Sequence, residues 1–339
     1  MSLGLDLGRQ TIKAVELTQG RAKPVLKNCG VIGHNFGGIE NFKDEKSIAN
    51  YAGTIKKLLN DAKIREKNVS ISIPEYEVFT RTIKFPMLSE QEISAAIKWE
   101  AEEYIPMPVA EAIIEHQIIE KVDTGSGQEV LVLLVAVPKS TVEQYIKVAS
   151  VAGLNVVGVD TAMISSSRSL SIGLQEDVII VDMGNHSTDI AIAKNGQLAL
   201  SRSFPTAGAA FTRAVAQTLN SNEVQAEEYK KTYGLDPTQL EGKIEKALTP
   251  IFKVVSDEVK KSMHYFQSET NGQMPASLLL VGGSAGLPGV IPAFSRMLNI
   301  EVSVGNPFQS IEVDKEKSET LKNFMPLYSQ AAGLALRFD

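Results

Sequence analysis

Two stretches of the chain share one pattern of apolar and polar positions, at residues 4–17 and 178–200. In each, an apolar run leads into Asp-apolar-Gly, which is Asp6-Leu7-Gly8 in the first stretch and Asp182-Met183-Gly184 in the second. A short polar loop that contains a threonine follows, and then a second alternating run. Because alternation is the period of a half-buried strand, the pattern predicts two β-hairpins of the same construction.

The similarity between the two stretches extends downstream. Each hairpin is followed by a glycine turn and a third strand, which begins at Val25 in the first half and spans 197–202 in the second. Later in each half, a predicted helix precedes an apolar strand, at 69–73 and 278–281. Asp-x-Gly by itself is a common turn sequence, but two unrelated hairpins would not explain this shared order. We therefore predict an α/β fold of two duplicated lobes that face one another.

Between the two halves the pattern predicts six further elements. They are a strand at 78–85, a helix, strands at 112–122 and 129–137, a helix at 140–152 and a strand at 155–159. The first helix begins with a capping box, Ser89-x-x-Glu92, and ends before the prolines of residues 105–108. This β-α-β-β-α-β order is typical of a ferredoxin-like module. It predicts a subdomain at residues 77–160 that is inserted into the first lobe.

These elements divide the chain into seven segments. The first lobe core takes residues 1–76 and 161–177, on either side of the insert. The second lobe core takes residues 178–208 and 276–325. A long helical subdomain at 209–275 interrupts the second core, with a break near residues 234–237. A C-terminal helix in residues 326–339 is expected to return to the first lobe.

Composition excludes several classes of function. The chain has 339 residues, with 34 Lys and Arg against 40 Asp and Glu, for a net charge of −6. A nucleic-acid-binding protein usually has a basic surplus, so no nucleic-acid partner is predicted. Its four histidines, which do not have zinc-ligand spacing, are His34, His116, His186 and His264.

The chain also has no sequence signal for export or membrane insertion. Cys29 has no second cysteine to pair with, which fits a reducing compartment. The longest strictly apolar run, residues 131–137, is far short of the roughly 20 residues that a membrane span needs. The N-terminus lacks a basic region followed by an apolar one. We therefore expect a cytoplasmic protein without direct membrane insertion.

The two hairpins have the residue types of a phosphate site. A tight hairpin with glycine at its bend presents backbone N–H groups that suit phosphate oxygens. Asp6 and Asp182 cannot bind phosphate themselves, but each can hold Mg²⁺, which bridges phosphate oxygens. Lys13, on the second strand of the first hairpin, can neutralise phosphate charge. The alternative for Lys13 is a solvated strand lysine. Two such hairpins on opposite lobes predict a clamp for a triphosphate and its metal.

A glycine-rich segment at 278–294 offers a third contact. Gly282 and Gly283 follow an apolar strand and would let the backbone approach a ligand closely. The same residues with Ser284 match G-x-S-x-G of the hydrolase nucleophile elbow. That fold needs a histidine after the serine, and the last histidine precedes it, which excludes the elbow. G-x-x-x-x-G-K-[ST] is also absent from the sequence, which excludes a P-loop enzyme.

Together these motifs resemble the actin-like ATPase superfamily, which includes actin, the sugar kinases, the heat-shock chaperone ATPase domain and FtsA. The resemblance implies ATP and Mg²⁺ as cofactors, with Asp6 and Asp182 at the metal. It implies three groups of nucleotide contacts. The first hairpin supplies Gly8, Arg9, Gln10, Thr11 and Lys13. The second lobe supplies Gly184, Asn185, His186, Ser187, Thr188 and Gly208. The adenosine contacts are Glu227, Lys230, Gly282, Gly283 and Ser284.

The resemblance can be narrowed to one branch of the actin-like superfamily. Only about 15 residues separate Cys29 from the first helix, which leaves no room for actin's own small-lobe insertion. The insert after Phe79 is similar instead to FtsA and to PilM, the type IV pilus assembly family. The PilM-like segments are 85–108, 152–160, 201–212, 304–308 and 331–337. FtsA also carries a C-terminal amphipathic membrane helix, which is not expected here because the chain stops two residues past Arg337.

The PilM resemblance implies a function and a partner. It implies an ATP-binding component of the pilus inner-membrane platform, with other platform proteins as partners and self-association left open. The N-terminal peptide of PilN, a single-span membrane protein, would dock between the first lobe and the insert and bring the chain to the inner face of the cytoplasmic membrane. The alternatives are an FtsA-like scaffold and a sugar or acetate kinase, which needs a catalytic carboxylate and an additional insert in the cleft.

Two positions of this chain depart from the sequence pattern of FtsA-like proteins. The glycine pair expected near the second-lobe phosphate contact is Ala207-Gly208, with one glycine. FtsA-like chains have an acidic residue before a proline at the strand-helix junction where this chain has Ala162-Met163, and Asp160 lies two residues earlier. Asp160 therefore joins Asp6 and Asp182 as a candidate catalytic residue, and ATP hydrolysis, if any, is expected to be slow.

Overall fold

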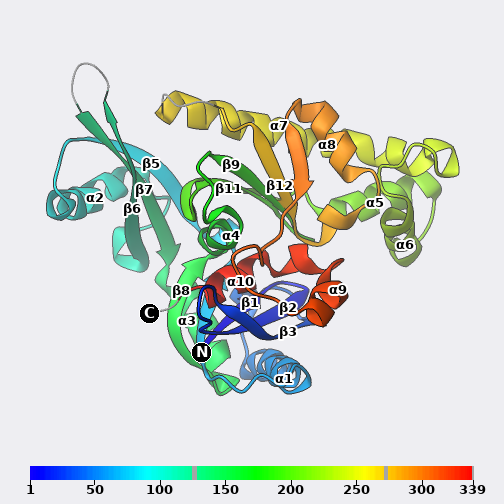
Figure 1. Ribbon diagram of the computed structural model, residues 1–339, viewed down its shortest axis with the longest axis horizontal. Helices are drawn as coiled ribbons and strands as arrows, with labels where there is room; N and C mark the ends of the chain where they lie inside the picture. The colour runs from blue at the N-terminus through cyan, green and yellow to red at the C-terminus, as the bar shows by residue number, and fades with distance from the viewer. Residues whose placement is uncertain (124–127, 271–273, 338–339) are drawn as a thin grey trace.

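A computed structural model describes residues 1–123, 128–270 and 274–337 of the chain. Two five-stranded sheets form the two lobes (Figure 1). The first has the order β3-β2-β1-β4-β8 and the second β11-β10-β9-β12-β13. In both, three antiparallel strands are followed by two strands parallel to the first. This identical topology confirms the predicted duplication.

The strands follow the sequence pattern closely. Those of the first lobe are β1 (Ser2–Leu7), β2 (Thr11–Thr18), β3 (Val25–Gly33), β4 (Asn68–Ile73) and β8 (Asn155–Thr161). Those of the second lobe are β9 (Val178–Met183), β10 (Thr188–Lys194), β11 (Gln197–Phe204), β12 (Ser277–Val281) and β13 (Glu301–Val304). Strand β9 is buried along its whole length, as expected of a central strand with both faces covered.

Helices cover the outer faces of both sheets and fill the space between them (Figure 1). The first lobe carries α1 (Glu45–Asp61) and α3 (Lys139–Val151), and the second carries α5 (Gly208–Leu219), α6 (Glu223–Tyr233), α7 (Lys243–Thr270) and α8 (Val290–Leu298). Helices α4 (Ala162–Ser171) and α10 (Ser329–Ala335) pack on each other between the lobes. A short α9 (Lys315–Leu321) and a 3₁₀ turn, η6 (Met325–Tyr328), lead into α10.

The crossing of α4 and α10 is unusually close. A Cβ built on Gly333 would lie 1.7 Å from the Ser165 carbonyl oxygen, so only glycine fits there. Five serines of α4 are fully buried, and they are Ser165, Ser166, Ser167, Ser169 and Ser171. Small side chains allow two helix backbones to approach, and their hydroxyl groups can bond to nearby carbonyls, as Ser169 does to Ser329 O at 2.7 Å. The contact between α4 and α10, which lies between the lobes, is therefore made by small residues.

The inserted subdomain is shorter than the sequence predicted. Its sheet has the order β5-β7-β6, formed by β5 (Phe79–Pro86), β6 (Ala112–Asp123) and β7 (Gln128–Pro138), with α2 (Glu90–Tyr104) on one face. The predicted last strand, β8, instead pairs in parallel with β4 of the first lobe, and α3 packs on α1. The boundary at residue 160 and the four-stranded ferredoxin-like sheet were therefore wrong, and the insert spans residues 79–138.

The reason for this difference lies in strand pairing, which spacing along the chain does not reveal. Strand β8 occupies the same place in the first sheet as β13 does in the second. Strand β7 is the central strand of the insert, which explains its apolar run. Leu134 and its neighbours on one face pack with α2, whereas Leu133 and Val135 on the other face join a core cluster that contains residues of both lobes. The predicted capping box of α2 is present, with Ser89 and Glu92 bonded reciprocally.

Candidate functional site

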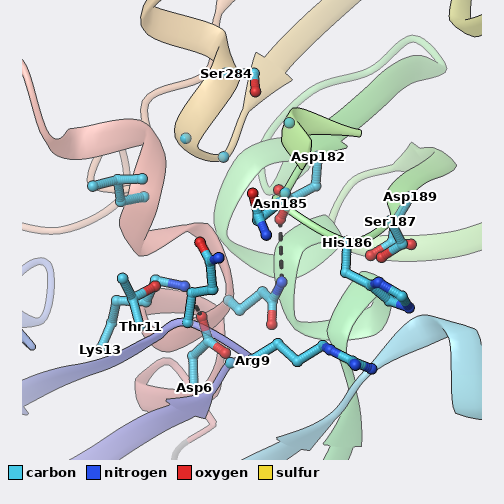
Figure 2. A pocket seen from close by; sticks show the side chains of 18 of the residues that line it. Asp6, Arg9, Thr11, Lys13, Asp182, Asn185, His186, Ser187, Asp189 and Ser284 are labelled. Atoms are coloured by element: carbon cyan, nitrogen blue, oxygen red, sulfur yellow. Dashed lines mark hydrogen bonds and ion pairs between the residues drawn. The ribbon is translucent and has the colours of Figure 1, made fainter. Parts of the chain in front are cut away.

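A cavity of about 520 Å³ lies between the two lobes. Both hairpin loops, the turn after β12, and helices α6 and α10 contribute to its lining. Figure 2 shows Asp6 and Arg9 from the first hairpin across the cavity from Asp182 and Asn185 of the second. The repeated motif therefore forms two opposite walls of one site.

The first hairpin loop is held by a charged pair. Asp6 is buried at the end of β1, and Lys13 Nζ donates to its Oδ2 at 2.7 Å across the hairpin. A Cβ on Gly8 would lie 2.6 Å from the Thr11 carbonyl oxygen, so the tight bend requires glycine. Arg9 extends sideways to Glu40, with 3.1 Å between Nη1 and Oε1. The loop backbone of residues 8–10 is left facing the cavity.

The second hairpin loop is docked on the N-terminus of α5. Gly208 N–H donates to Gly184 O and Ala209 N–H to Asn185 O, both at 3.0 Å. Asp182 is buried at the end of β9, and Gln330 Nε2 of α10 donates to its Oδ2 at 3.1 Å. Burial raises the pKa of Asp182, while the nearby Lys13 charge opposes that rise. A cation between the lobes would therefore be favoured at this carboxylate.

The glycine pair after β12 forms the third wall. Gly282 has φ +81°, and a Cβ built there would lie 2.3 Å from Asp182 Oδ1. At Gly283, in contrast, a Cβ would have nothing within 4 Å among the described atoms. The two glycines thus have different roles: Gly282 lets the turn pass Asp182, and Gly283 leaves the cavity open.

Glu227 and Lys230 of α6 form a coupled pair at the edge of the cavity. Lys230 Nζ lies 2.6 Å from Glu227 Oε2 and 2.9 Å from Thr212 Oγ1. Burial lowers the pKa of Lys230, and Glu227 opposes this. Burial also acts to raise the pKa of Glu227, but the bonds from Lys230 and Thr212 outweigh it and leave that pKa lowered. The pair places one cation and one anion at the edge of the cavity.

Almost all residues predicted for the site line this cavity. They are Asp6, Gly8, Arg9, Gln10, Thr11, Lys13, Asp182, Gly184, Asn185, His186, Ser187, Gly208, Glu227, Lys230, Gly282, Gly283 and Ser284. Thr188 is the first exception: it is buried at the start of β10, and its hydroxyl donates to Thr206 O at 2.7 Å. Thr188 supports the loop from behind and is not part of the lining.

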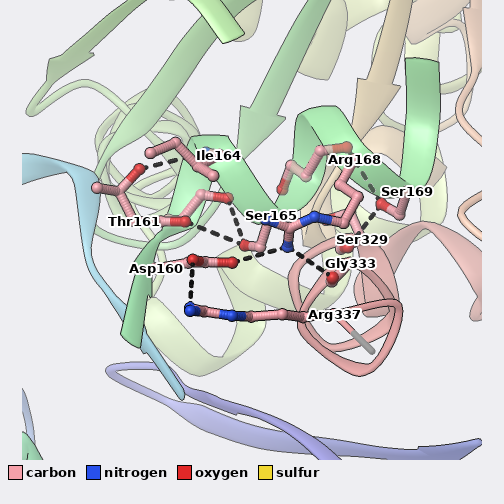
Figure 3. A network of polar contacts seen from close by, with 11 residues as sticks. Asp160, Thr161, Ile164, Ser165, Arg168, Ser169, Ser329, Gly333 and Arg337 are labelled. Carbon is pink, nitrogen blue, oxygen red and sulfur yellow. Dashed lines mark hydrogen bonds and ion pairs between the residues drawn. The ribbon is translucent and has the colours of Figure 1, made fainter. Parts of the chain in front are cut away.

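Asp160 is the second exception, and the structure does not bring it to the cavity. Its carboxylate accepts from Arg168 at 2.7 Å and from Arg337 at 3.1 Å (Figure 3). Arg168 also donates to Gly333 O at 2.9 Å, which ties α4 to α10. Ala162, two residues later, does line the cavity. Asp160 therefore links β8 to α4 and to Arg337, and its carboxylate is engaged by two guanidinium groups outside the cavity lining.

Several lining residues were missed from the sequence. Asp189 lines the cavity but was not assigned to the site, although it directly follows Thr188 of the second hairpin. The others come from segments without a local signal, and they are Ser72, Pro74, Tyr76, Lys231, Leu287, Phe324, Leu327 and Gln330. Tyr76 lies between the lobes, where its ring meets the His186 ring edge-on at 5.5 Å.

The lining suits Mg²⁺ with a phosphate ligand better than a metal held by protein alone. In the described part of the chain, no group of three or more His, Cys, Asp or Glu side chains is placed to hold a metal. Mg²⁺ typically uses one or two carboxylates together with phosphate oxygens and water. Asp6 and Asp182 on opposite walls match that need. The donor set therefore fits a nucleotide-bound Mg²⁺.

Comparison with known proteins identifies the family. The model for "Type IV pilus assembly protein PilM" matches residues 4–339. The chain belongs to the PilM family. The solved PilM-PilN type IV pilus biogenesis complex contains a chain that is 26% identical, with a TM-score of 0.83 over 99% of this chain and 98% of that one. The predicted resemblance to PilM is thereby confirmed.

More distant structures share the actin-like fold of the PilM family. EutJ, the ethanolamine utilization protein of Carboxydothermus hydrogenoformans, is 18% identical, with a TM-score of 0.59 over 99% of this chain and 89% of EutJ. MreB5 of Spiroplasma citri, solved with ADP, is 14% identical, with a TM-score of 0.53 over 98% and 94% of the two chains. These likenesses concern the fold, and they confirm the actin-like architecture of the two lobes.

The chain is also similar to the cell division protein FtsA. The cell division protein FtsA of Pseudomonas aeruginosa is 26% identical over 208 residues, which cover 54% of this chain and 48% of FtsA. FtsA of Escherichia coli K12 is 23% identical over 242 residues, which cover 62% of this chain and 56% of FtsA. The chain thus matches about half the length of these relatives. Among the described helices, none is both long and apolar enough to cross a membrane.

Proposed function

We propose that the chain binds ATP with Mg²⁺ between its lobes and serves as an actin-like component of the type IV pilus assembly platform. One observation carries the nucleotide assignment. Two copies of the same hairpin loop, from different lobes, face one cavity, each with a carboxylate at its strand end. A glycine turn with open space beside it completes the cavity. This arrangement supports a phosphate chain between the loops and a nucleoside beside Gly283.

The residues of the chain would act mainly by binding and orientation. Asp6 and Asp182 would hold the metal ion, which neutralises phosphate charge when bound. Besides the metal ion, Lys13 supplies a positive charge beside the first loop, where it is paired with Asp6. The backbone N–H groups of both loops can receive phosphate oxygens. Glu227 and Lys230 lie where the nucleoside end would lie.

We expect ATP hydrolysis to be slow. Ala162, which stands at the N-terminus of α4 beside the cavity, has no group that can accept a proton from water. Asp160 is engaged by two arginines outside the lining. The expected rate is well below the roughly 1 to 100 s⁻¹ of kinases. ATP would then act as a bound ligand that links the two lobes.

Isothermal titration calorimetry with and without Mg²⁺ tests the nucleotide assignment. ATP is expected to bind in the presence of Mg²⁺ and more weakly after chelation with EDTA. A phosphate-release assay on the same sample checks the slow turnover. A coupled assay for ADP, with and without small sugars, detects a kinase, because a kinase transfers the phosphoryl group to the sugar and frees ADP but no phosphate. Absence of ATP binding in the presence of Mg²⁺ would contradict the proposal, and sugar-dependent ADP release would indicate a metabolic kinase.

The partner that we propose is the cytoplasmic N-terminal peptide of a PilN-like membrane protein. Docking beside the insert would recruit this chain to the inner face of the cytoplasmic membrane. The described sheet order β5-β7-β6 supports a binding mode, because β6 has a strand neighbour on one side. Its other edge can accept an added extended strand. We expect the peptide to bind at this edge, in the position between the first lobe and the insert that the PilM resemblance implies.

Hydrogen exchange with a synthetic peptide tests this docking. The peptide carries the N-terminal residues of the PilN-like protein, and a scrambled peptide serves as the control. We expect the native peptide to slow exchange of amides in β6, with no change in β13, which is an edge strand of the second-lobe sheet. Binding without protection of the insert or of the adjoining first lobe would place the docking site elsewhere.

A further inference from the structure

The carbonyl of Gly8, in the first hairpin loop, is held by two buried side chains. His34 Nε2 lies 2.9 Å from Gly8 O, and the Tyr51 hydroxyl donates to the same oxygen at 3.0 Å. His34 follows β3 and Tyr51 lies in the middle of α1. Both side chains are buried on the first-lobe side of the loop, and neither lines the cavity. The Gly8 carbonyl is therefore directed into the lobe and away from the cavity.

The hydrogen bonds of His34 fix which ring nitrogen carries the proton. The backbone N–H of Phe36 donates to Nδ1 at 3.3 Å, so Nδ1 acts as an acceptor and has no hydrogen. In a neutral imidazole the proton then lies on Nε2, which donates to Gly8 O. Burial lowers the pKa of His34, which keeps the ring neutral. The backbone N–H of His34 also donates to Gln10 O at 2.8 Å, so His34 holds the loop at two carbonyls.

The direction of the Gly8 carbonyl sets the direction of the next N–H. The Gly8–Arg9 peptide is trans, and in a trans peptide the C=O and the following N–H point in opposite directions. With the carbonyl directed into the lobe, the Arg9 N–H is directed to the cavity side. Glycine allows this peptide to flip at low energy. A flipped peptide would present a carbonyl oxygen to a phosphate and repel it.

We propose that His34 and Tyr51 are positioning residues for phosphate binding, because they hold the Gly8 carbonyl away from the cavity and so aim the Arg9 N–H at the nucleotide. This inference rests on the proposed ATP site and deepens it. It explains why two buried donors from different elements converge on one carbonyl of a glycine loop. It also predicts that their loss affects the phosphates of a nucleotide and spares the nucleoside.

The test compares the affinities of ATP and adenosine by calorimetry, in Mg²⁺, for matched variants. Tyr51→Phe and His34→Phe each remove a donor while keeping an aromatic ring in place. His34→Gln is the conservative variant, because an amide N–H can replace Nε2–H. Tyr328→Phe is the control, since Tyr328 is a buried first-lobe tyrosine that does not line the cavity. Urea unfolding of each variant verifies that it is folded.

We expect each single variant to weaken ATP binding by about three- to tenfold, as the net loss of one hydrogen bond implies. The double variant should lose at least about tenfold, with adenosine affinity unchanged. His34→Gln and Tyr328→Phe should bind ATP like the parent. Equal losses for ATP and adenosine, or no loss in the double variant, would overturn the positioning role. A parent protein that binds no ATP would overturn both this inference and the proposed function.

Discussion

Asp189 lies directly opposite Asp182 in the second hairpin, at the position where the first hairpin has Lys13 opposite Asp6. The first pair neutralises itself, whereas the second places two acids side by side in a buried site. Burial raises the pKa of Asp189 well above its ordinary range, and the charge of Asp182 adds to this, against a hydrogen bond from Ser203. The duplicated hairpins therefore differ in charge at one equivalent position.

This difference predicts the pH dependence of stability. The folded pKa of Asp189 lies above its unfolded value, so the folded state keeps a proton that the unfolded chain releases. The stability contribution is fully present below the unfolded pKa of about 3.9 and is lost as the pH rises toward the folded pKa. Asp189→Asn cannot release that proton. We expect its free energy of unfolding to exceed the parent value by more at pH 8 than at pH 5.

Urea unfolding at the two pH values, without nucleotide or Mg²⁺, measures this difference. The gain of the variant should grow by at most about 1.4 kcal/mol for each pH unit. Asp257→Asn, which changes an exposed carboxylate on α7, is the control and should show no such growth. A constant difference between parent and Asp189→Asn across pH would contradict the raised pKa.

Substitution by alanine should lower the stability of the protein at Gly282 and leave it unchanged at the adjacent Gly283. Gly282→Ala puts a side chain at φ +81° and 2.3 Å from Asp182 Oδ1. We expect a loss of at least about 1–2 kcal/mol in the free energy of unfolding, from backbone strain alone. Gly283→Ala meets open space and should stay within about 0.5 kcal/mol of the parent. Chemical denaturation of both variants measures these free energies of unfolding. Equal values for the two variants would contradict the backbone geometry assigned to Gly282 and Gly283.

A large side chain at Gly283 should block nucleotide binding without unfolding the protein. Gly283→Arg would fill the space assigned to the nucleoside, and its Cβ has room in the free protein. Gly286→Arg is the matched control, since Gly286 also has open space around its Cβ but does not line the cavity. We expect calorimetry to show no ATP binding for the first variant and parental affinity for the second. ATP binding by Gly283→Arg would refute the placement of the nucleoside.

Asp160 should stabilise the fold and leave nucleotide chemistry unchanged. Asp160→Asn removes the charge that Arg168 and Arg337 share. Because the arginines are partly exposed, we expect a loss of about 1–3 kcal/mol, less than for a fully buried pair. Asp61→Asn breaks the exposed pair with Lys57 and should change stability by less than about 1 kcal/mol. ATP affinity and phosphate release should match the parent, and a large fall in phosphate release would restore Asp160 as a catalytic residue.

The sequence predicted those parts of the fold and site that depend on local patterns. The hairpins were predictable because alternation, an aspartate and a glycine bend lie within fourteen or so residues of one another. The insert boundary was not, because β8 follows α3 in the order of a ferredoxin-like module yet pairs with β4, about 87 residues earlier. Pairing partners of that separation leave no trace in the pattern of a single sequence.

The same distinction applies to the site. Gly282 and Asp182 were identified from their own motifs, although their close approach, which leaves no room for a Cβ on Gly282, was not. Gln330, in contrast, reaches Asp182 from the C-terminal helix, and Tyr76 reaches His186 from the base of the insert. Neither belongs to a recognisable motif, because their roles arise from the packing of the lobes. Asp160 had the right residue type near the right position, but two arginines engage it.

The position of the two large additions has a consequence for the two sheets. In the first lobe the insert enters between β4 and β8, and in the second lobe the helices α5–α7 enter between β11 and β12. Each addition interrupts a connection between strands and leaves the five-strand order of its half intact. The outer surface of a lobe can therefore be enlarged within such a connection while the order of strands that holds the two opposed loops stays the same.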